Sequence, residues 1–239
     1  MMTFSGEIAP NAAAIIAGLG SGDILAMAGR SRVSRTIKVG TCSRFSHVAG
    51  ISRISHELLK RLARQGAFDH LQLQPFPDGT PLVAGWTDRH VLIEATTLCT
   101  DPCIFLGTPV RGVQAHVPAE RIAKYDGQVW VCKVNPDYPL TDVEEDQLAT
   151  YLLRQLGKPY DDPGALMSVA GEILRRTVLI KWLLGWRADL NKVFCDRLWA
   201  GALRSINRFA FENPGGYTPG SFVLRLLEVG MHLEPVRVK

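Results

Sequence analysis

The stretch Ser43-Arg-Phe-Ser-His47-Val-Ala-Gly-Ile51 decides how the first half of the chain folds. Residues 46–51 indicate a strand, and successive side chains of a strand point to opposite faces, so we expect His47 and Val48 on different sides of a sheet. An apolar run at 24–27, Ile-Leu-Ala-Met, predicts an earlier strand. The segment between them, residues 29–45, is polar and rich in basic residues, and it predicts a loop.

Capping residues indicate two of the helices that follow. Ser55 is the expected N-cap of a helix that ends at Gly66. Thr141 and Glu144 form a capping box that opens a helix over 142–156. Further strands are expected at 91–95, 110–115 and 128–134, and further helical stretches at 164–185 and 194–206. Since strands gather in the first half and helices in the second, the sequence predicts an α+β fold, with an antiparallel β-sheet packed against helices.

The order of these segments also suggests the domain organisation. Residues 1–21 are expected to form an N-terminal arm, and residues 22–239 a single domain, because no internal repeat or low-complexity tract divides the chain. Within that domain, residues 162–192 are expected to form a helical insertion or lid.

Composition excludes several classes of protein. The net charge of +4 is too small for a dedicated nucleic-acid binder, and no basic run has interleaved aromatic residues. The five cysteines are odd in number and irregularly spaced, which argues against a disulfide framework. A metal site at Cys99 and Cys103 would need further ligands nearby. The only candidates in the sequence are Cys132 and His116, and their spacing is not that of a zinc finger or ribbon. We therefore expect reduced, partly buried thiols, no metal and no cofactor.

The N-terminus does not resemble a signal peptide. No Lys or Arg precedes Arg30, and the apolar run over residues 12–19 is short. No stretch is long enough to span a bilayer without a charge. A cytoplasmic location is the default expectation, and export without a cleaved signal stays open.

Three residues carry the chemistry that the sequence suggests. Cys195 lies in the first turn of a helix, where the backbone N–H groups and the helix dipole favour the thiolate. His47 is an imidazole that could activate a thiol. Glu94 stands on the otherwise apolar run 91–95, and a half-buried carboxylate needs a partner such as an imidazole. Taken singly, Cys195 and His47 are more often ordinary core or surface residues.

Several short motifs in one order bring these residues together. Residues 22–25 (Gly-Asp-Ile-Leu) and the Ser-His-Val at 46–48 resemble the opening of circularly permuted NlpC-type papain-like proteins, in the YiiX-like branch. The later motifs are Glu94-Ala95, Gly112-Val113, Gly157-Lys-Pro-Tyr-Asp161, Phe194-Cys195 and Tyr217-Thr-Pro219. The resemblance covers residues 22–222 and has the histidine before the cysteine, which is the family's hallmark.

The resemblance implies a papain-like fold and a thiol hydrolase or acyltransferase. It assigns the nucleophile to Cys195, the general base to His47 and the orienting carboxylate to Glu94, and it suggests that Tyr160 binds substrate. The family usually follows its cysteine with Ser-Glu, whereas Asp196 and Arg197 stand here. This departure supports an alternative: a catalytically inactive papain-like binding or structural protein, for example in a phage or secretion assembly.

The expected substrate depends on the role of residues 178–186, the most apolar stretch of the chain. Their apolar pattern favours a core helix. Two other roles also fit. The stretch could form a lid or acyl-chain groove in which Trp182 binds substrate, or residues 175–186 could form an interfacial helix that contacts a membrane surface. The resemblance allows a peptidoglycan-type peptide or a lipid or acyl amide as substrate. The sequence does not determine the oligomeric state.

Overall fold

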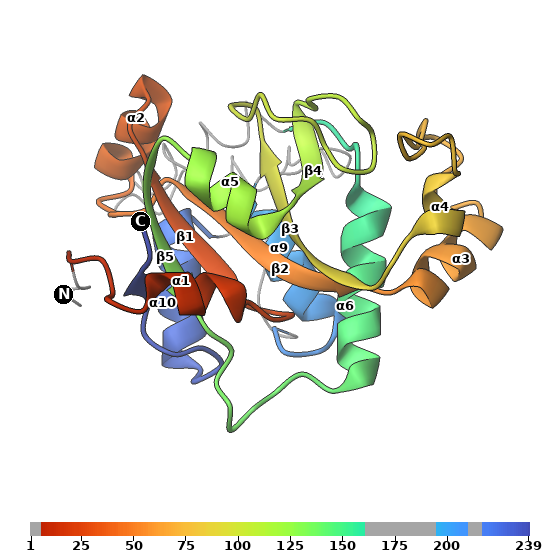
Figure 1. The fold of residues 1–239 in the computed structure, drawn as a ribbon. Helices are drawn as coiled ribbons and strands as arrows, with labels where there is room; N and C mark the ends of the chain where they lie inside the picture. Colours follow the sequence, from red (N-terminus) through yellow and green to blue (C-terminus); the bar gives the residue numbers. More distant parts are fainter. Residues whose placement is uncertain (1–5, 161–194, 210–216) are drawn as a thin grey trace, which may run out of the picture.

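An antiparallel sheet of six strands is the framework of the computed structural model, which describes residues 6–160, 195–209 and 217–239 (Figure 1). Neighbouring strands pair antiparallel throughout, which confirms the predicted α+β class and the antiparallel sheet. In spatial order the strands are β4 (Gly112–His116), β3 (Arg89–Thr96), β2 (His47–Ile54), β1 (Ile24–Gly29), β5 (Gly127–Cys132) and β6 (Val236–Arg237).

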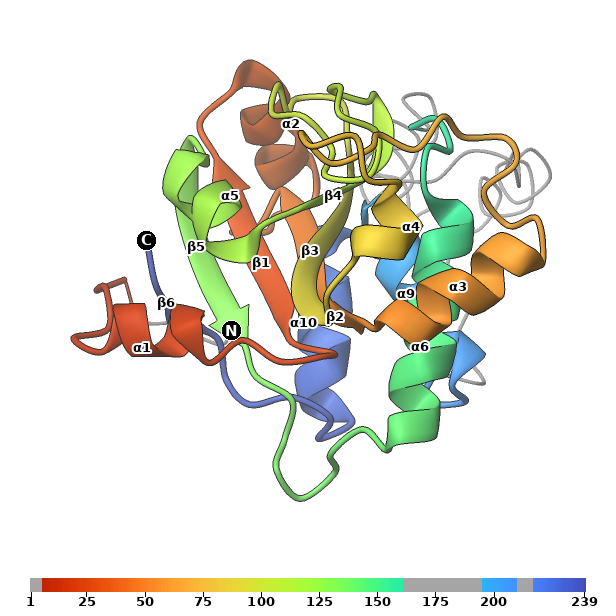
Figure 2. The same ribbon diagram turned by 45° about the vertical axis from the view of Figure 1, so that its right-hand side comes forward.

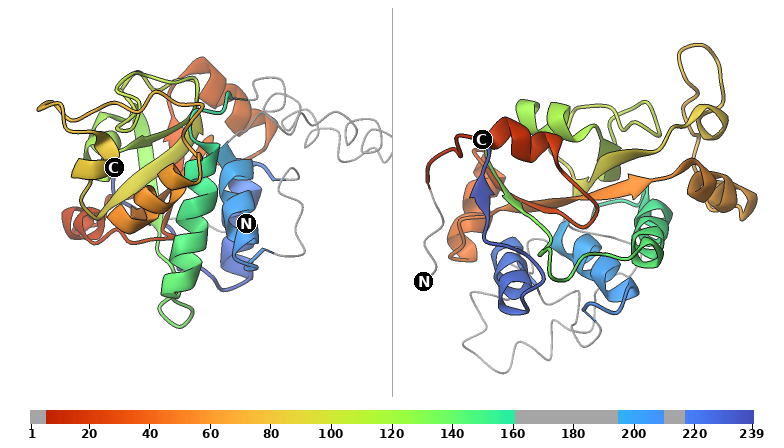
Figure 3. Two further views of the ribbon diagram at one scale, coloured as in Figure 1. Left: turned by 90° about the vertical axis from the view of Figure 1, so that its right-hand side faces the viewer. Right: turned by 60° about the horizontal axis from the view of Figure 1, so that its bottom comes forward.

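Three helices cover one face of this sheet: α6 (Asp142–Gln155), α9 (Cys195–Ser205) and α10 (Pro219–Glu228). Figure 3, right, shows them as one layer beneath the strands. Val48 of β2 and Ile93 of β3 belong to this side, where they pack in one cluster with Leu198. Trp199 lies against Gly50, where an added Cβ would come within 2.5 Å of the indole ring. Gly50 therefore lets α9 approach the sheet closely.

Two short helices, α1 (Ala12–Ala17) and α5 (Pro118–Lys124), cover the opposite face (Figure 3, right). Leu25, Met27 and Leu92 form a second apolar cluster there together with Ile122 of α5. Since both faces of β1 are covered, all its residues are buried, which explains its uninterrupted apolar sequence. The expected N-terminal arm includes α1, which packs against this cluster.

The predicted caps are confirmed. Ser55 accepts a hydrogen bond from the Leu58 N–H and opens α3 (His56–Arg64). Thr141 and Glu144 make both bonds of the capping box that opens α6. Gly157, with φ +75°, ends that helix. Figure 2 shows α3 beside α6 and the single turn α4 (Leu82–Gly85).

The predicted loop over residues 29–45 is wrong in its middle part. Residues 32–40 form α2 (Arg32–Gly40), whose N-cap Ser31 accepts from the Ser34 N–H. Ser34 is the one buried residue of this helix, and Val33 and Val39 are exposed, so α2 packs little apolar surface against the rest of the molecule. The short elements α1, α4, α5, α10 and β6 were also not among the expected elements.

Several expectations concern residues outside the described ranges. These are the helical stretch 164–185, the insertion 162–192 and the apolar stretch 178–186. In the part of the chain that the structure describes, no helix has the length and apolarity needed to cross a membrane.

Candidate functional site

His47 is the first residue of β2, at the end of the sheet where that strand enters. It lies opposite Met27 of β1, and its side chain is 11% exposed. Its Nε2 atom lies 2.6 Å from Oε2 of Glu94. The other ring nitrogen, Nδ1, is therefore the one available for a thiol or a substrate.

Glu94 is fully buried in the middle of β3, opposite Ala49. Besides His47, it accepts two hydrogen bonds from Arg121 of α5: Nε to Oε1 at 2.6 Å and a terminal nitrogen to Oε2 at 3.3 Å. Burial alone would raise the pKa of Glu94, but the bonds and charges of His47 and Arg121 outweigh it and lower the pKa to about 2. Glu94 is thus a fixed negative charge, and its predicted pairing with His47 is present.

Cys195 is the first residue of α9 and is only 3% exposed. Its Sγ atom accepts a hydrogen bond from the backbone N–H of Val48, the residue that follows His47. Burial, helped by the neighbouring Asp196, raises the pKa of this thiol far above its ordinary value, although the Val48 N–H acts in the opposite direction. In this conformation Cys195 is a neutral thiol, whereas the sequence suggested a thiolate favoured by the helix start.

Asp196 is buried as well, at 1% exposure. Its Oδ1 accepts from the Arg197 N–H at 2.8 Å, and its Oδ2 has no hydrogen-bond partner among the described residues. Burial raises its pKa to about 8. The departure from the family pattern at this position therefore places a mostly protonated carboxyl group beside the thiol at neutral pH.

Tyr125 follows α5 and packs against the apolar cluster on the α5 side of the sheet. Its hydroxyl bonds the side chain of Ser46, and burial, together with the charge of Glu94, raises its pKa. Arg121 lies over its ring at 5.3 Å. The histidine and the carboxylate thus lie on the α5 side of the sheet, and the thiol contacts the same strand, β2, from the α9 side through the Val48 N–H.

A second group of polar residues continues from Glu94 along the same face. His116 of β4 has its Nε2 3.5 Å from Oε1 of Glu94 and 3.6 Å from Sγ of Cys99. Gln114 lies directly opposite Glu94 in the register of β3 and β4. The sequence did not predict that Glu94 lies near Arg121, His116 and Gln114. Neither the register of β3 with β4 nor the position of α5 on the sheet can be derived from the sequence.

The structure tests neither of the two expected substrate-binding roles, those of Tyr160 and Trp182. Tyr160 is half-buried and packs against the core cluster on the α9 side, with its N–H bonded to the Arg111 carbonyl. This contact accounts for its position in the core, and its binding role stays a prediction. Trp182 lies outside the described residues.

Comparisons with known proteins find a likeness among solved structures but none among family models or curated proteins. The chain is similar to the crystal structure of the metalloprotein YiiX from Escherichia coli O157:H7. The two chains are 16% identical, with a TM-score of 0.44, over 91% of this chain and 88% of that one. The papain-like assignment stays a prediction.

Proposed function

We propose that the protein is a thiol hydrolase or acyltransferase in which Cys195 is the nucleophile, His47 the general base and Glu94 the carboxylate that orients the imidazole. The observation that carries this proposal is the 2.6 Å bond between a fully buried carboxylate and Nε2 of His47, next to the residue whose N–H contacts Cys195. Such a carboxylate holds the ring in one orientation and stabilises its charged form.

The proposed reaction proceeds in two steps. His47 takes the proton of the Cys195 thiol, and the sulfur attacks the carbonyl carbon of an amide or ester. The C–N or C–O bond then breaks, the leaving group takes the proton from His47, and the acyl group stays on sulfur. Water or another acceptor, deprotonated by His47, attacks the thioester and releases the acyl group. Glu94 keeps its negative charge throughout.

Labelling with iodoacetamide at mildly acidic pH tests the catalytic pair. A buried thiol without assistance reacts slowly, whereas a thiol that transfers its proton to His47 reacts even below its own pKa. We expect Cys195 to be alkylated faster than the exposed Cys42, and His47→Ala to abolish this advantage. If Cys195 reacts no faster than Cys42, the proposal fails.

The substrate class is the second part of the proposal: a peptidoglycan-type peptide or a lipid or acyl amide. Purified muropeptides and a fatty-acyl amide should be offered in parallel, with Cys195→Ala as the control. Cleavage of only one of them, lost in that variant, assigns the class. No turnover of either, with Cys195 nevertheless alkylated rapidly, means that both substrate classes are wrong.

One observation favours a second candidate, a catalytically inactive protein that binds a partner through the same fold. Cys195 is nearly inaccessible, and this burial raises the pKa of its thiol far above the ordinary value. Under this alternative, the four buried cysteines should all be alkylated more slowly than Cys42, and His47→Ala should leave every rate unchanged.

A further inference from the structure

Cys99, His116 and Glu94 bring three kinds of metal-binding atom together on the α5 face of the sheet. The sulfur of Cys99, Nε2 of His116 and a carboxylate oxygen of Glu94 all lie within 4.8 Å of one another, and all three residues are buried. They come from β3, from the loop after it and from the end of β4. The backbone pairing of β3 with β4 therefore fixes the spacing of two of the three ligands.

Two of the three separations between these atoms fit a tetrahedral metal ion, and the third, between Cys99 Sγ and the Glu94 carboxylate, lies within 4.8 Å. Zinc bonds of roughly 2.3 Å to sulfur and about 2.0–2.1 Å to nitrogen or oxygen place neighbouring ligands about 3.3–3.6 Å apart at the tetrahedral angle. The observed distances are 3.6 Å between Cys99 Sγ and His116 Nε2, and 3.5 Å between His116 Nε2 and Glu94 Oε1. A hydrogen bond from the thiol would explain the first distance but not the second.

The residues behind the ligands hold them in place. His47 and Arg121 fix the carboxylate of Glu94, which keeps a lone pair on Oε1 besides the one that accepts from Arg121. The ring of His116 bonds the backbone carbonyl of Pro102. That bond uses an N–H of the ring, which in the neutral tautomer leaves Nε2, the atom facing Cys99, as an acceptor. Supports of this kind are typical of metal-binding histidines and carboxylates.

Gln114 is an independent sign that something polar belongs here. It is fully buried and shares a sheet face with Glu94, yet neither its amide nitrogen nor its amide oxygen has a hydrogen-bond partner among the described residues. Buried amides normally bond protein or an ordered water or ion. His116 also lines a small surface pocket, together with Arg121, Asp101 and Lys124.

We propose that Cys99, His116 and Glu94 bind a divalent transition-metal ion of the zinc class, with a fourth position for water or a small ligand. Thiolate, imidazole and carboxylate are the donors that zinc takes, and three protein ligands leave such a position open. Binding replaces the proton of the Cys99 thiol by the metal, so one proton is released and no electron is transferred. The negative charges of Glu94 and the thiolate compensate the metal beside Arg121.

Titration of the metal-free full chain with Co²⁺ tests this site, because a cysteine ligand gives cobalt an intense thiolate-to-metal charge-transfer band. We expect one Co²⁺ per chain with that band, and displacement of the cobalt by Zn²⁺. Cys99→Ala should lose the band, and His116→Ala should bind at least tenfold more weakly. Cys103→Ser, four residues from Cys99 and buried like it, is the matched control and should keep the band.

The outcomes separate this inference from the proposed function. Cys195→Ala, which removes the proposed nucleophile, should keep both the band and the stoichiometry. Absence of a band in the wild type, or a band that survives in Cys99→Ala, overturns the metal site. Circular dichroism shows whether each variant folds. If Cys99→Ala does not fold, Cys99→Ser replaces it, and Zn²⁺ should then raise the melting temperature of the wild type but not of this variant.

Discussion

Glu94 is the residue on which the candidate site depends, because it links two histidines and an arginine that come from three different elements. A carboxylate without solvent contact persists only with such partners. Its neighbours Ile93 and Ala95 face the opposite, apolar side of β3. The carboxylate of Glu94 is therefore the counter-charge of both Arg121 and His47, and a neutral residue at position 94 would remove it.

Glu94→Gln tests this dependence, since the substitution keeps the shape and removes the charge. It leaves the buried guanidinium of Arg121 without its counter-charge, and breaking a buried ion pair in this way costs about 3–5 kcal/mol. We expect that loss in the free energy of unfolding, measured with urea on metal-free protein. Asp146→Asn, which breaks the exposed pair with Arg61, is the control and should cost less than about 1 kcal/mol. Equal losses would contradict the argument.

Asp196 destabilises the folded protein at neutral pH, whereas the paired carboxylate of Glu94 stabilises it. Its pKa is raised from 3.8 to about 8 in the folded state, so the folded protein binds more protons than the unfolded chain between these values. The stability contributed by the protonated group is complete below pH 3.8 and is lost as the pH rises through about 8. At neutral pH the residue therefore destabilises the fold.

Asp196→Asn should stabilise the protein at neutral pH, because Asn cannot ionise and its Oδ1 can still accept from the Arg197 N–H. We expect a gain on the order of 4 kcal/mol near pH 7, because each pH unit above the unfolded pKa of 3.8 contributes about 1.4 kcal/mol until the folded pKa of about 8 is reached. Urea unfolding at a series of pH values measures it. The advantage should shrink towards pH 4. A gain that does not depend on pH would show that packing, not ionisation, causes it.

At the scale of elements, the site forms where β2 enters the sheet between α5 and α9. The strand-initiating His47, the caps of α3 and α6, and the glycine that ends α6 could all be predicted, because each depends on neighbours in sequence. The position of α5 on the sheet could not be predicted. This helix has only seven residues, and nothing in its sequence indicates that Arg121 is buried and contacts Glu94. His116 was considered only as a partner for cysteines, and the β3–β4 register brings it to Glu94.

Gly50→Ala should displace α9 from β2. The added Cβ would lie 2.5 Å from the Trp199 ring, whose Nε1 donates to the Ile93 carbonyl at 2.9 Å. Overpacking of this kind costs about 1–3 kcal/mol, which a urea titration detects. Because α9 carries Cys195, we also expect the alkylation rate of that thiol to change. Gly20→Ala, where the nearest atom is 4.0 Å away, is the matched control and should leave both readings unaltered.

At the scale of the whole molecule, two faces of one sheet supply the two halves of the candidate site. The α5 face contributes the charged and metal-binding groups, and the α9 face contributes the thiol. The order of motifs predicted that His47, Glu94 and Cys195 belong together. It could not predict that the cysteine approaches from the opposite side of the sheet, because the placement of α9 follows from the apolar side chains of helix and sheet rather than from the motif residues.

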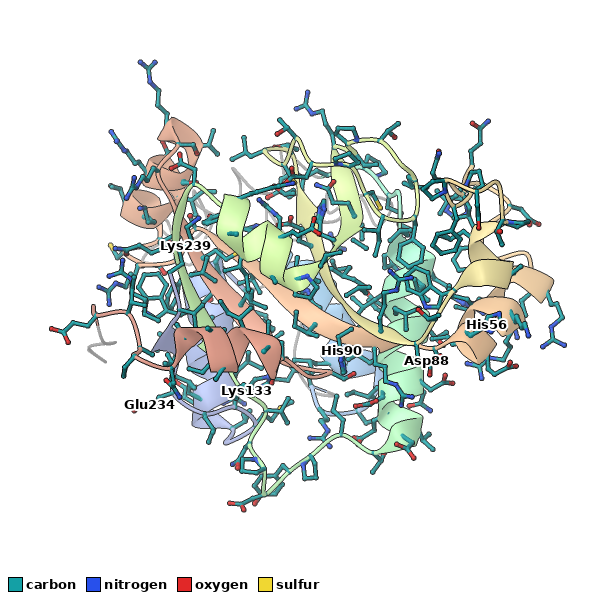
Figure 4. The ribbon with its side chains drawn as sticks, in the orientation of Figure 1. His56, Asp88, His90, Lys133, Glu234 and Lys239 are labelled. Carbon is teal, nitrogen blue, oxygen red and sulfur yellow. The ribbon has the colours of Figure 1, made fainter. Side chains whose placement is uncertain are left out.

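The C-terminal segment also contributes to the site, through the helix that carries Arg121. Lys239 is anchored beside β5, where its carbonyl accepts from the Val129 N–H (Figure 4). Its Nζ donates to the carbonyls of Ile122 and Ala123 at 3.2 and 2.6 Å, and to that of Tyr125 at 2.6 Å. These carbonyls belong to the C-terminal end of α5 and the residue after it, where a cation also interacts favourably with the helix dipole.

Lys239→Met should therefore loosen α5 without unfolding the sheet. Removing a cation from a helix C-terminus costs about 1 kcal/mol, and the freed carbonyls must find water instead. We expect faster hydrogen exchange of the α5 amides, measured by mass spectrometry, with the amides of β1 unchanged. Lys60→Met, at an exposed lysine paired only with Glu57, is the control and should not alter exchange in α5. If Lys239→Met leaves α5 as protected as in the wild type, the contacts of Lys239 do not hold the helix, and packing of Ile122 together with the Arg121–Glu94 pair must account for its position.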